Sequence, residues 1–286
     1  MLQRILPGLV LLTLTSCTVQ GWSPDLEGKD VRLTILHTSD IHSRLLPYEY
    51  TPMYTDEQLG LDGARGPFGG IARIATILKR ERKLAQRCLY VDSGDISQGA
   101  PIYNMFSGEV EMRALGTLRP DVVVVGNHEF DRGAENFAWN LASWSSFPNL
   151  AANYDFRESD QPWNNTLEEQ IQPWHITELD GLKVGFIGIG DMSSITSLEE
   201  ADNSLDLDAT GALWTLEHYG ALLEPEVDLL VVVSHAGLHT DEDMARYSRY
   251  ADVIMGGHLH IAIDPPKLVA SEVVPGKRVL VCHSGA

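Results

Sequence analysis

P-D-V-V-V-V-G-N-H-E-F-D, residues Pro120–Asp131, is the stretch that decides the fold. Its consecutive valines are typical of a strand that is buried on both faces, as in a parallel sheet covered by helices. The run continues into Asn127 and His128. Loops past the carboxyl ends of strands form the ligand crevice of open α/β sheets, so both residues are candidate site residues. A single histidine after a strand is more often structural, and the rest of the chain has to supply the context.

The same pattern recurs in other apolar runs, each of which ends in aspartate or histidine. These runs are Val31–Asp40 (with His42 beyond it), Cys88–Asp95, Val227–His235, and Ala251–His260, which carries both His258 and His260. If the strands are parallel neighbours, these side chains converge on one edge of the sheet. In an extended segment, Asp40 and His42 would face the same side. Carboxylate, amide and imidazole groups are ligands that divalent metals select, so the sequence predicts a metal site at this edge.

Helix and strand signals alternate along the chain. Helical patterns occur at Phe68–Arg87, Glu109–Leu118, Gly133–Ser145, Thr210–Leu223 and Asp241–Arg249. Further strands are predicted at Leu150–Asn153 and in a hairpin of Ile176–Asp180 with Leu182–Ile189, whereas Asp155–Gln172 is polar and loop-like. The alternation predicts an α/β fold, with a parallel-rich sheet covered by helices on both sides in a layered sandwich.

Two long loops receive separate interpretations. Pro47–Pro67, rich in proline and glycine, is interpreted either as a wall or lid of the site or as a solvent loop. Asp191–Asp208 is acidic but lacks the spacing of an EF-hand, which favours a solvated loop over a calcium site. His37, inside the first strand, is interpreted as structural.

The charge balance excludes some partners. The chain has 286 residues and a net charge of −19, from 21 basic and 40 acidic side chains. Such a balance argues against binding nucleic acid or an anionic membrane through a basic face. A phosphate-containing substrate would need bound cations to reverse the local field. No internal repeat or second domain boundary is evident after Lys29.

The first residues indicate export. Residues 1–16 combine a basic start with a short apolar run, which is typical of a signal peptide, and L-T-S-C resembles the bacterial lipobox. Cys17 would then be the lipidated first residue of a lipoprotein, residues 17–29 a tether, and Thr18 would favour the outer membrane. An ordinary signal peptide with an incidental cysteine is the alternative. Cys88 and Cys282 are predicted to be buried, unpaired thiols.

Several sequence blocks, taken in order, carry a family resemblance. They are Leu36–His42, Gly69–Arg73, Ser93–Asp95, Gly126–Asp131, Ser234–Gly237 and Gly256–His258. These blocks resemble those of the calcineurin-like metallophosphoesterase superfamily, and within it the exported 5′-nucleotidase family, from about Val31 to Gly285. The resemblance implies a layered α/β/β/α sandwich with mixed, parallel-rich sheets over residues 30–286.

The resemblance also implies a dinuclear centre of Mn, Fe, Zn or Co ions. By matching positions, Asp40, His42 and His260 hold one ion, Asn127, His235 and His258 hold the other, and Asp95 bridges them. Such a pair of ions lowers the pKa of a shared water, so that a bridging hydroxide can attack phosphorus in line.

The residues around His128 receive roles from the same resemblance. His128 matches the catalytic histidine, which stabilises the transferred phosphoryl group and protonates the leaving alkoxide. Asn127 and His128 would therefore contact the substrate. Asp131 is placed to accept the other imidazole N–H and fix its tautomer. Glu129 is interpreted as a structural carboxylate at the start of the following helix.

The expected function is metal-dependent hydrolysis of phosphate monoesters, with AMP-like nucleotides as the expected substrates. Relatives of the 5′-nucleotidase type carry a C-terminal domain for the nucleotide, which we expect this chain to lack. Two alternatives stay open: a phosphodiesterase or 2′,3′-cyclic-nucleotide hydrolase that uses the same site, and a truncated, catalytically silent lipoprotein that binds metal. The sequence does not set the oligomeric state.

Overall fold

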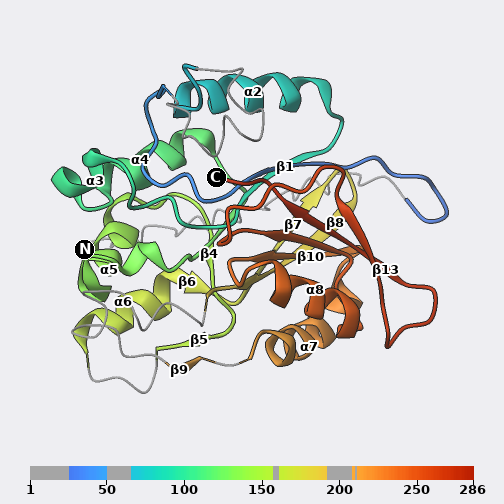
Figure 1. Cartoon of the computed structure of the whole chain (residues 1–286). Helices are drawn as coiled ribbons and strands as arrows, with labels where there is room; N and C mark the ends of the chain where they lie inside the picture. The colour runs from blue at the N-terminus through green and yellow to red at the C-terminus, as the bar shows by residue number, and fades with distance from the viewer. Residues whose placement is uncertain (1–25, 50–65, 157–160, 192–207, 210) are drawn as a thin grey trace, which may run out of the picture.

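The computed structural model describes residues 26–49, 66–156, 161–191, 208–209 and 211–286 (Figure 1). The predicted signal peptide, Cys17 and most of the tether lie outside these residues, as do most of the Pro47–Pro67 and Asp191–Asp208 loops. Within the part that is described, no helix is both long and apolar enough to cross a bilayer.

The first sheet is fully parallel and has the order β1-β2-β3-β4-β6. Its strands are β1 Thr34–Thr38, β2 Cys88–Asp92, β3 Val122–Val124, β4 Asn149–Leu150 and β6 Ile171–Gln172. Helices connect most neighbouring strands: α2 Ile71–Leu84, α3 Pro101–Phe106, α4 Glu109–Leu118, α5 Gly133–Trp144 and α6 Pro162–Gln170. The expected strand–helix alternation is therefore present in this half.

The second sheet is mixed, with the order β12-β13-β11-β10-β8-β7. Its strands are β7 Trp174–Leu179, β8 Leu182–Ile189, β10 Leu229–Ser234, β11 Val253–Gly256, β12 Lys267–Ala270 and β13 Arg278–His283. The inner strands run parallel, and β7 and β12 pair antiparallel at the two edges. Helices α7 Ala212–Leu223 and α8 Leu238–Tyr247 belong to this half, and β5 Tyr154–Asp155 pairs separately with β9 Asp208–Ala209.

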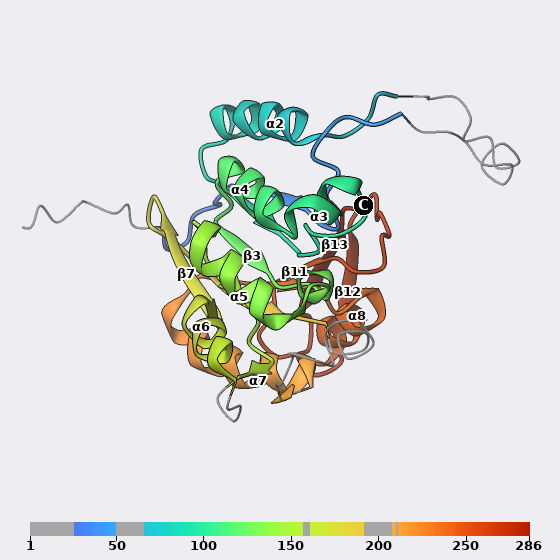
Figure 2. The ribbon, with the colours of Figure 1, turned by 90° about the vertical axis from the view of Figure 1, so that its left-hand side faces the viewer.

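The core forms three apolar layers, one between the sheets and one outside each of them. Leu89, Val91 and Val122 of the first sheet pack between the sheets with Phe186 and Val231 of the second. Their alternate neighbours in the first sheet point outward against α2, α4, α5 and α6, which form one layer in the turned view (Figure 2). Helices α7 and α8 cover the outer face of the second sheet. The architecture is therefore α/β/β/α.

The structure corrects the prediction of a single sheet with helices on both faces. Each sheet has helices on one face and the other sheet on its second face. Strands in either arrangement are buried on both sides, so the run Val122–Val125 cannot distinguish them. The four-layer sandwich that the family resemblance implied is confirmed.

The prediction that Asp155–Gln172 is a loop is wrong, because it contains α6 and β6. This helix buries few side chains. Leu167 is fully buried, and Trp163 packs partly against the apolar layer outside the first sheet. So sparse an apolar stripe in a polar segment gives little periodic signal. Helix α3 was not predicted, and the predicted helix Asp241–Arg249 begins earlier, at Leu238.

The two cysteines of the described chain are unpaired, as predicted, but they are only partly buried. Cys88 lies on β2 and Cys282 on β13, in different sheets.

Candidate metal centre

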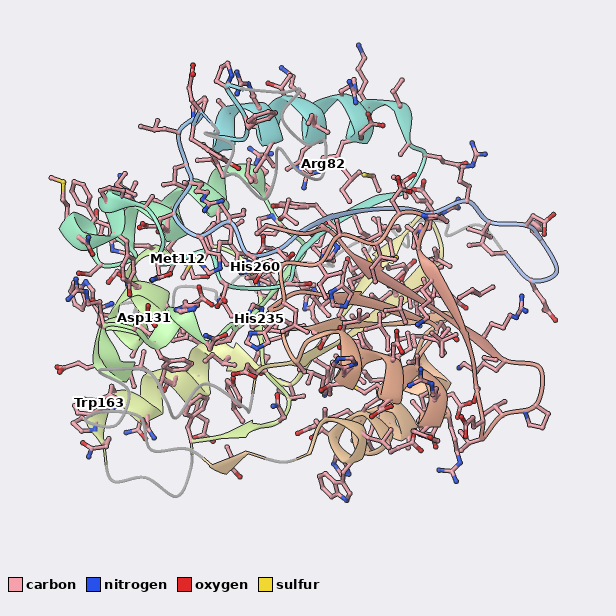
Figure 3. All side chains as sticks on the ribbon, viewed as in Figure 1. Arg82, Met112, Asp131, Trp163, His235 and His260 are labelled. Atoms are coloured by element: carbon pink, nitrogen blue, oxygen red, sulfur yellow. The ribbon has the colours of Figure 1, made fainter. Side chains whose placement is uncertain are left out.

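The parallel strands of both sheets deliver the candidate residues to one end of the sandwich. Asp40 and His42 follow β1, Asp95 follows β2, and Asn127 and His128 follow β3. From the second sheet, His235 follows β10, and His258 and His260 follow β11. His235 and His260, with Asp131 nearby, lie in this region in Figure 3. The convergence predicted at one sheet edge thus takes place between two sheets.

The backbone at this end is in the left-handed region at most of the candidate positions. The φ angles are 52° at Asp40, 48° at His42, 56° at Asp95, 77° at His258 and 54° at His260. The prediction that Asp40 and His42 share an extended segment is therefore wrong. Non-glycine residues with such angles cost about 1–3 kcal/mol each and persist where the surroundings fix them. Here the strained backbone turns the side chains inward.

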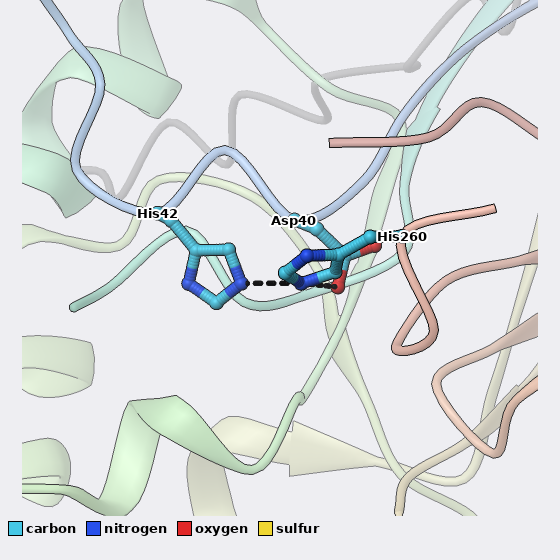
Figure 4. A group of neighbouring side chains, drawn as sticks. All are labelled: Asp40, His42 and His260. Atoms are coloured by element: carbon cyan, nitrogen blue, oxygen red, sulfur yellow. Dashed lines mark hydrogen bonds and ion pairs between the residues drawn. The ribbon is translucent and has the colours of Figure 1, made fainter. Parts of the chain in front are cut away.

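Asp40, His42 and His260 form one cluster of donor atoms, all within 4.8 Å of one another (Figure 4). His42 Nε2 lies 2.9 Å from His260 Nε2, and His260 Nε2 lies 3.6 Å from Asp40 Oδ1. His42 Nδ1 lies 3.2 Å from the Ser97 carbonyl oxygen and can donate to it, which leaves the Nε2 lone pair directed into the cluster. Burial lowers the pKa of His42, which favours the neutral ring that can bind a cation.

Asp95, His235 and His258 form the second cluster, again within 4.8 Å. His235 is buried, and its Nδ1–H donates to the Ser93 carbonyl oxygen at 2.5 Å. In the neutral ring this contact keeps the proton on Nδ1 and directs the Nε2 lone pair toward the cluster. Asn127 joins this group, because its Oδ1 lies 3.1 Å from His258 Nδ1.

Asp95 lies between the clusters. Its Oδ2 is 2.9 Å from His235 Nε2 and 3.9 Å from His42 Nε2. Burial lowers the pKa of His235, but the Asp95 and Asp40 carboxylates outweigh it and raise that pKa to about 10. Burial raises the pKa of Asp95, yet His235 outweighs it and holds that pKa below its ordinary value.

These residues fit a pair of divalent cations. His235 Nε2 is buried and makes no hydrogen bond of acceptable geometry, although Asp95 Oδ2 is close. A buried polar atom without a hydrogen-bond partner calls for an explanation. Carboxylate, imidazole and amide donors that converge on two adjacent points give one, since they match the donors that Mn, Fe, Zn and Co accept.

Backbone N–H groups from other loops hold the two aspartates, and the contact to Asp40 joins the two sheets. The His258 N–H donates to the Asp40 carboxylate at 3.0 Å, and the His128 N–H donates to Asp95 Oδ1 at 2.9 Å. Each carboxylate is therefore fixed by a loop from another strand. Orienting contacts of this kind hold the donor side chains in place before a metal ion binds.

Glu129 fixes the loops from beneath. Its buried carboxylate accepts the N–H groups of Asp95 at 3.0 Å, Ser97 at 3.2 Å and Gly126 at 2.8 Å. Burial, and then the charge of Asp95, raises its pKa to about 7. The structural role assigned to Glu129 is borne out by these contacts, but its reason is different. The carboxylate bridges two loops through these hydrogen bonds.

His128 stands beside the first cluster. Its ring centroid lies 5.3 Å from that of His42, and its Nδ1 lies 3.0 Å from both oxygens of Asp131. Burial lowers the pKa of His128, but the hydrogen bond with Asp131 and the charge of Asp95 outweigh it, so the pKa is raised. Asp131 thus contacts the imidazole as predicted.

Sequence reasoning missed three residues that support the site. Ser93 and Ser97 supply the carbonyl groups that orient His235 and His42, and no side-chain pattern reveals a carbonyl. Asp191 directly follows Gly190 at the end of β8 and is buried, with its Oδ1 3.9 Å from His258 Nε2. The rule that selected the other strand-end residues would have found Asp191.

Comparison with known families identifies the family of this chain. Residues 33–262 match the calcineurin-like phosphoesterase family. The chain belongs to this family. Its curated relatives include snake venom 5′-nucleotidase of Crotalus adamanteus, 30% identical over 88% of this chain, and 5′-nucleotidase of Homo sapiens, also 30% identical over 88%.

Solved structures share the same fold. The 5′-nucleotidase precursor from Thermus thermophilus superposes with a TM-score of 0.75, at 28% identity, over 88% of this chain and 48% of that one. NAD nucleotidase of Haemophilus influenzae has a TM-score of 0.75 over 89% of this chain and 45% of that one. At 23% identity it shows the fold alone. The chain spans 41% of the Crotalus protein and 42% of the human one, less than half of each.

Proposed function

We propose that this phosphoesterase-family chain hydrolyses phosphate monoesters, nucleotides foremost, with the help of two divalent cations. The observation that carries the proposal is the pair of donor clusters that share Asp95. The 5′-nucleotidases among its relatives support nucleotides as the substrate class.

In this proposal, Asp40, His42 and His260 hold one ion, and Asn127, His235 and His258 hold the other. Asp95 contacts both. The bound ions supply an activated water and offset the negative field that a phosphate ester would otherwise meet. The identity of the ions is left among Mn, Fe, Zn and Co.

His128 acts on the leaving group. Its Nδ1–H donates to Asp131, so the opposite nitrogen, Nε2, is available to the substrate. The raised pKa of His128 increases the protonated fraction near neutral pH. The Nε2–H proton then passes to the alkoxide oxygen as its bond to phosphorus breaks, and Asp131 stabilises the imidazolium before that transfer. Asn127 and His128 contact the phosphoryl group.

Location and organisation complete the proposal. We place the hydrolase domain at residues 30–286, after a signal peptide (1–16) and a tether (17–29). Export is supported by the basic start and short apolar run of residues 1–16. A lipid anchor on Cys17 would hold the protein at the outer membrane, facing the periplasm or the cell surface.

A substrate panel tests the proposal. The chain from Thr18 onward is stripped of metal, reloaded with manganese or zinc, and assayed on AMP, an aryl phosphate and an aryl phosphodiester. Turnover of AMP and the aryl phosphate is expected, and preference for the diester would favour a phosphodiesterase. Inactivity with two bound ions would contradict the proposal. Changing His128 to alanine should lower turnover by about 10²–10⁴-fold and leave the metal content intact.

A further inference from the structure

We propose that Asp191 is a positioning residue for His258, and through it for the second cation. Asp191 is buried at the carboxyl end of β8, with its Oδ1 3.9 Å from His258 Nε2. The inference rests on the proposed function, because it takes His258 to be a cation ligand.

The two ring nitrogens of His258 face different groups. Nδ1 lies 3.1 Å from Asn127 Oδ1, on the side of the other donors, and Nε2 lies toward Asp191. A ring that offers its Nδ1 lone pair to a cation must carry its proton on Nε2. A carboxylate on the Nε2 side fixes this tautomer, orients the ring and makes Nδ1 a stronger donor.

The two buried histidines of the clusters have their own orienting partners. His42 and His235 point Nδ1 at the carbonyl oxygens of Ser97 and Ser93. For His258, the group on the corresponding side is the Asp191 carboxylate. The separation of 3.9 Å exceeds a direct hydrogen bond. A small rotation of the ring, or one bridging water, completes the contact.

The segment that carries Asp191 is rigidly built. Asn153 Nδ2 donates to the Gly190 carbonyl at 3.0 Å, and the Gly190 N–H donates back to Asn153 Oδ1 at 2.8 Å. The Tyr154 hydroxyl donates to the Asp191 carbonyl at 2.6 Å. Asn153 and Tyr154 are themselves buried. A Cβ at Gly190 would lie 2.6 Å from the Tyr154 hydroxyl oxygen, so the close approach requires glycine.

Metal affinity tests the inference independently of turnover. The full chain carrying Asp191→Ala or Asp191→Asn is stripped and titrated with manganese against a competing chelator, and its thermal unfolding is recorded without metal. The loss of an orienting partner typically weakens metal binding about 10–100-fold. We expect a loss near the upper end for Ala and near the lower end for Asn, which keeps an acceptor oxygen. In both variants, the loss of affinity should be confined to one of the two ions.

Asp228→Asn is the matched control. Asp228 lies at the opposite end of the same sheet and accepts the Lys183 N–H at 2.8 Å, so the change also weakens a carboxylate contact to a strand. The Asp228→Asn variant should bind both manganese ions with the same affinities as the unchanged chain.

Two results would overturn the inference. One is an Asn variant that binds both ions as tightly as the unchanged chain does, which decides the matter even if the Ala variant does not fold. The other is an equal loss of affinity for both ions, together with a lower unfolding temperature. That result would mark Asp191 as merely structural. If the unchanged chain binds two ions but turns over no phosphate ester, the proposed function fails, while the comparison of affinities still stands.

Discussion

The two donor clusters are built in different ways although they share Asp95. The first, formed by Asp40, His42 and His260, is open, because the side chain of His260 is 50% exposed. The second is enclosed around His235, whose side chain is fully buried and whose tautomer is set by the Ser93 carbonyl. Pre-organised, water-excluded donors bind a cation more tightly than exposed ones. We therefore expect the second ion to be held more firmly and the first to exchange.

The largest effect should follow from removing His235. The His235→Ala change deletes a buried donor that Ser93 orients. In the proposed function this donor would hold one ion, and that ion would contribute several kcal/mol to transition-state stabilisation, so turnover should fall about 10³-fold or more. His260→Ala removes the matched histidine of the open cluster. It should lower turnover less, by about 10–100-fold. Turnover and bound metal are measured on both. Equal losses would contradict the difference between the clusters.

Removing Glu129 should weaken both clusters, because its carboxylate holds the shared Asp95. Glu129→Ala leaves the backbone N–H groups of Asp95, Ser97 and Gly126 without this acceptor, at about 1–3 kcal/mol each. The free energy of unfolding of the metal-free chain, measured in urea, should fall by at least about 3 kcal/mol.

An exposed glutamate provides the control for that change. Glu109 pairs with Arg113 at 2.8 Å on the surface of α4, and surface pairs of this kind contribute about 0–1 kcal/mol. Glu109→Ala should therefore change little. A Glu129→Ala variant of ordinary stability that still binds both ions would remove Glu129 from its role as the link between the loops.

The smallest effect concerns His37, which supports the enclosed cluster through Ser93. His37 Nε2 lies 2.8 Å from Ser93 Oγ, which donates to the Met255 carbonyl and so accepts from His37. Burial, and then the nearby His283, lower the pKa of His37 from 6.5 to about 3. Below about pH 6.5 the unfolded chain takes up a proton that the folded chain refuses, so the free energy of unfolding decreases as the pH falls.

This contribution amounts to about 2 kcal/mol at about pH 5. His37→Gln keeps an N–H for Ser93 but does not titrate, so the metal-free variant should lose about 2 kcal/mol less than the unchanged chain between about pH 7 and pH 5. Urea unfolding at both pH values measures the difference. Identical pH dependence in the two chains would show that His37 is not held neutral by burial.

The sequence predicted the structure well where a residue type allows only one environment. A valine run must be buried, and the polar residues after such runs do meet, as the distances among Asp40, Asp95 and His235 show. The sequence could not reveal that the strands form two sheets, because both arrangements bury the valines equally. It also could not reveal the left-handed turns at Asp40 and His258, which depend on hydrogen bonds from other strands. Helix α6 was missed because its buried face is mainly Leu167.

The central claim is that side chains from two sheets hold two ions through one shared carboxylate. The most direct test is the number and affinity of manganese ions bound per chain before and after Asp95→Ala. We expect two ions on the unchanged chain, one for each cluster, and weaker binding of both in the variant. A chain that binds fewer than two ions, or a variant that keeps both at unchanged affinity, would contradict the claim.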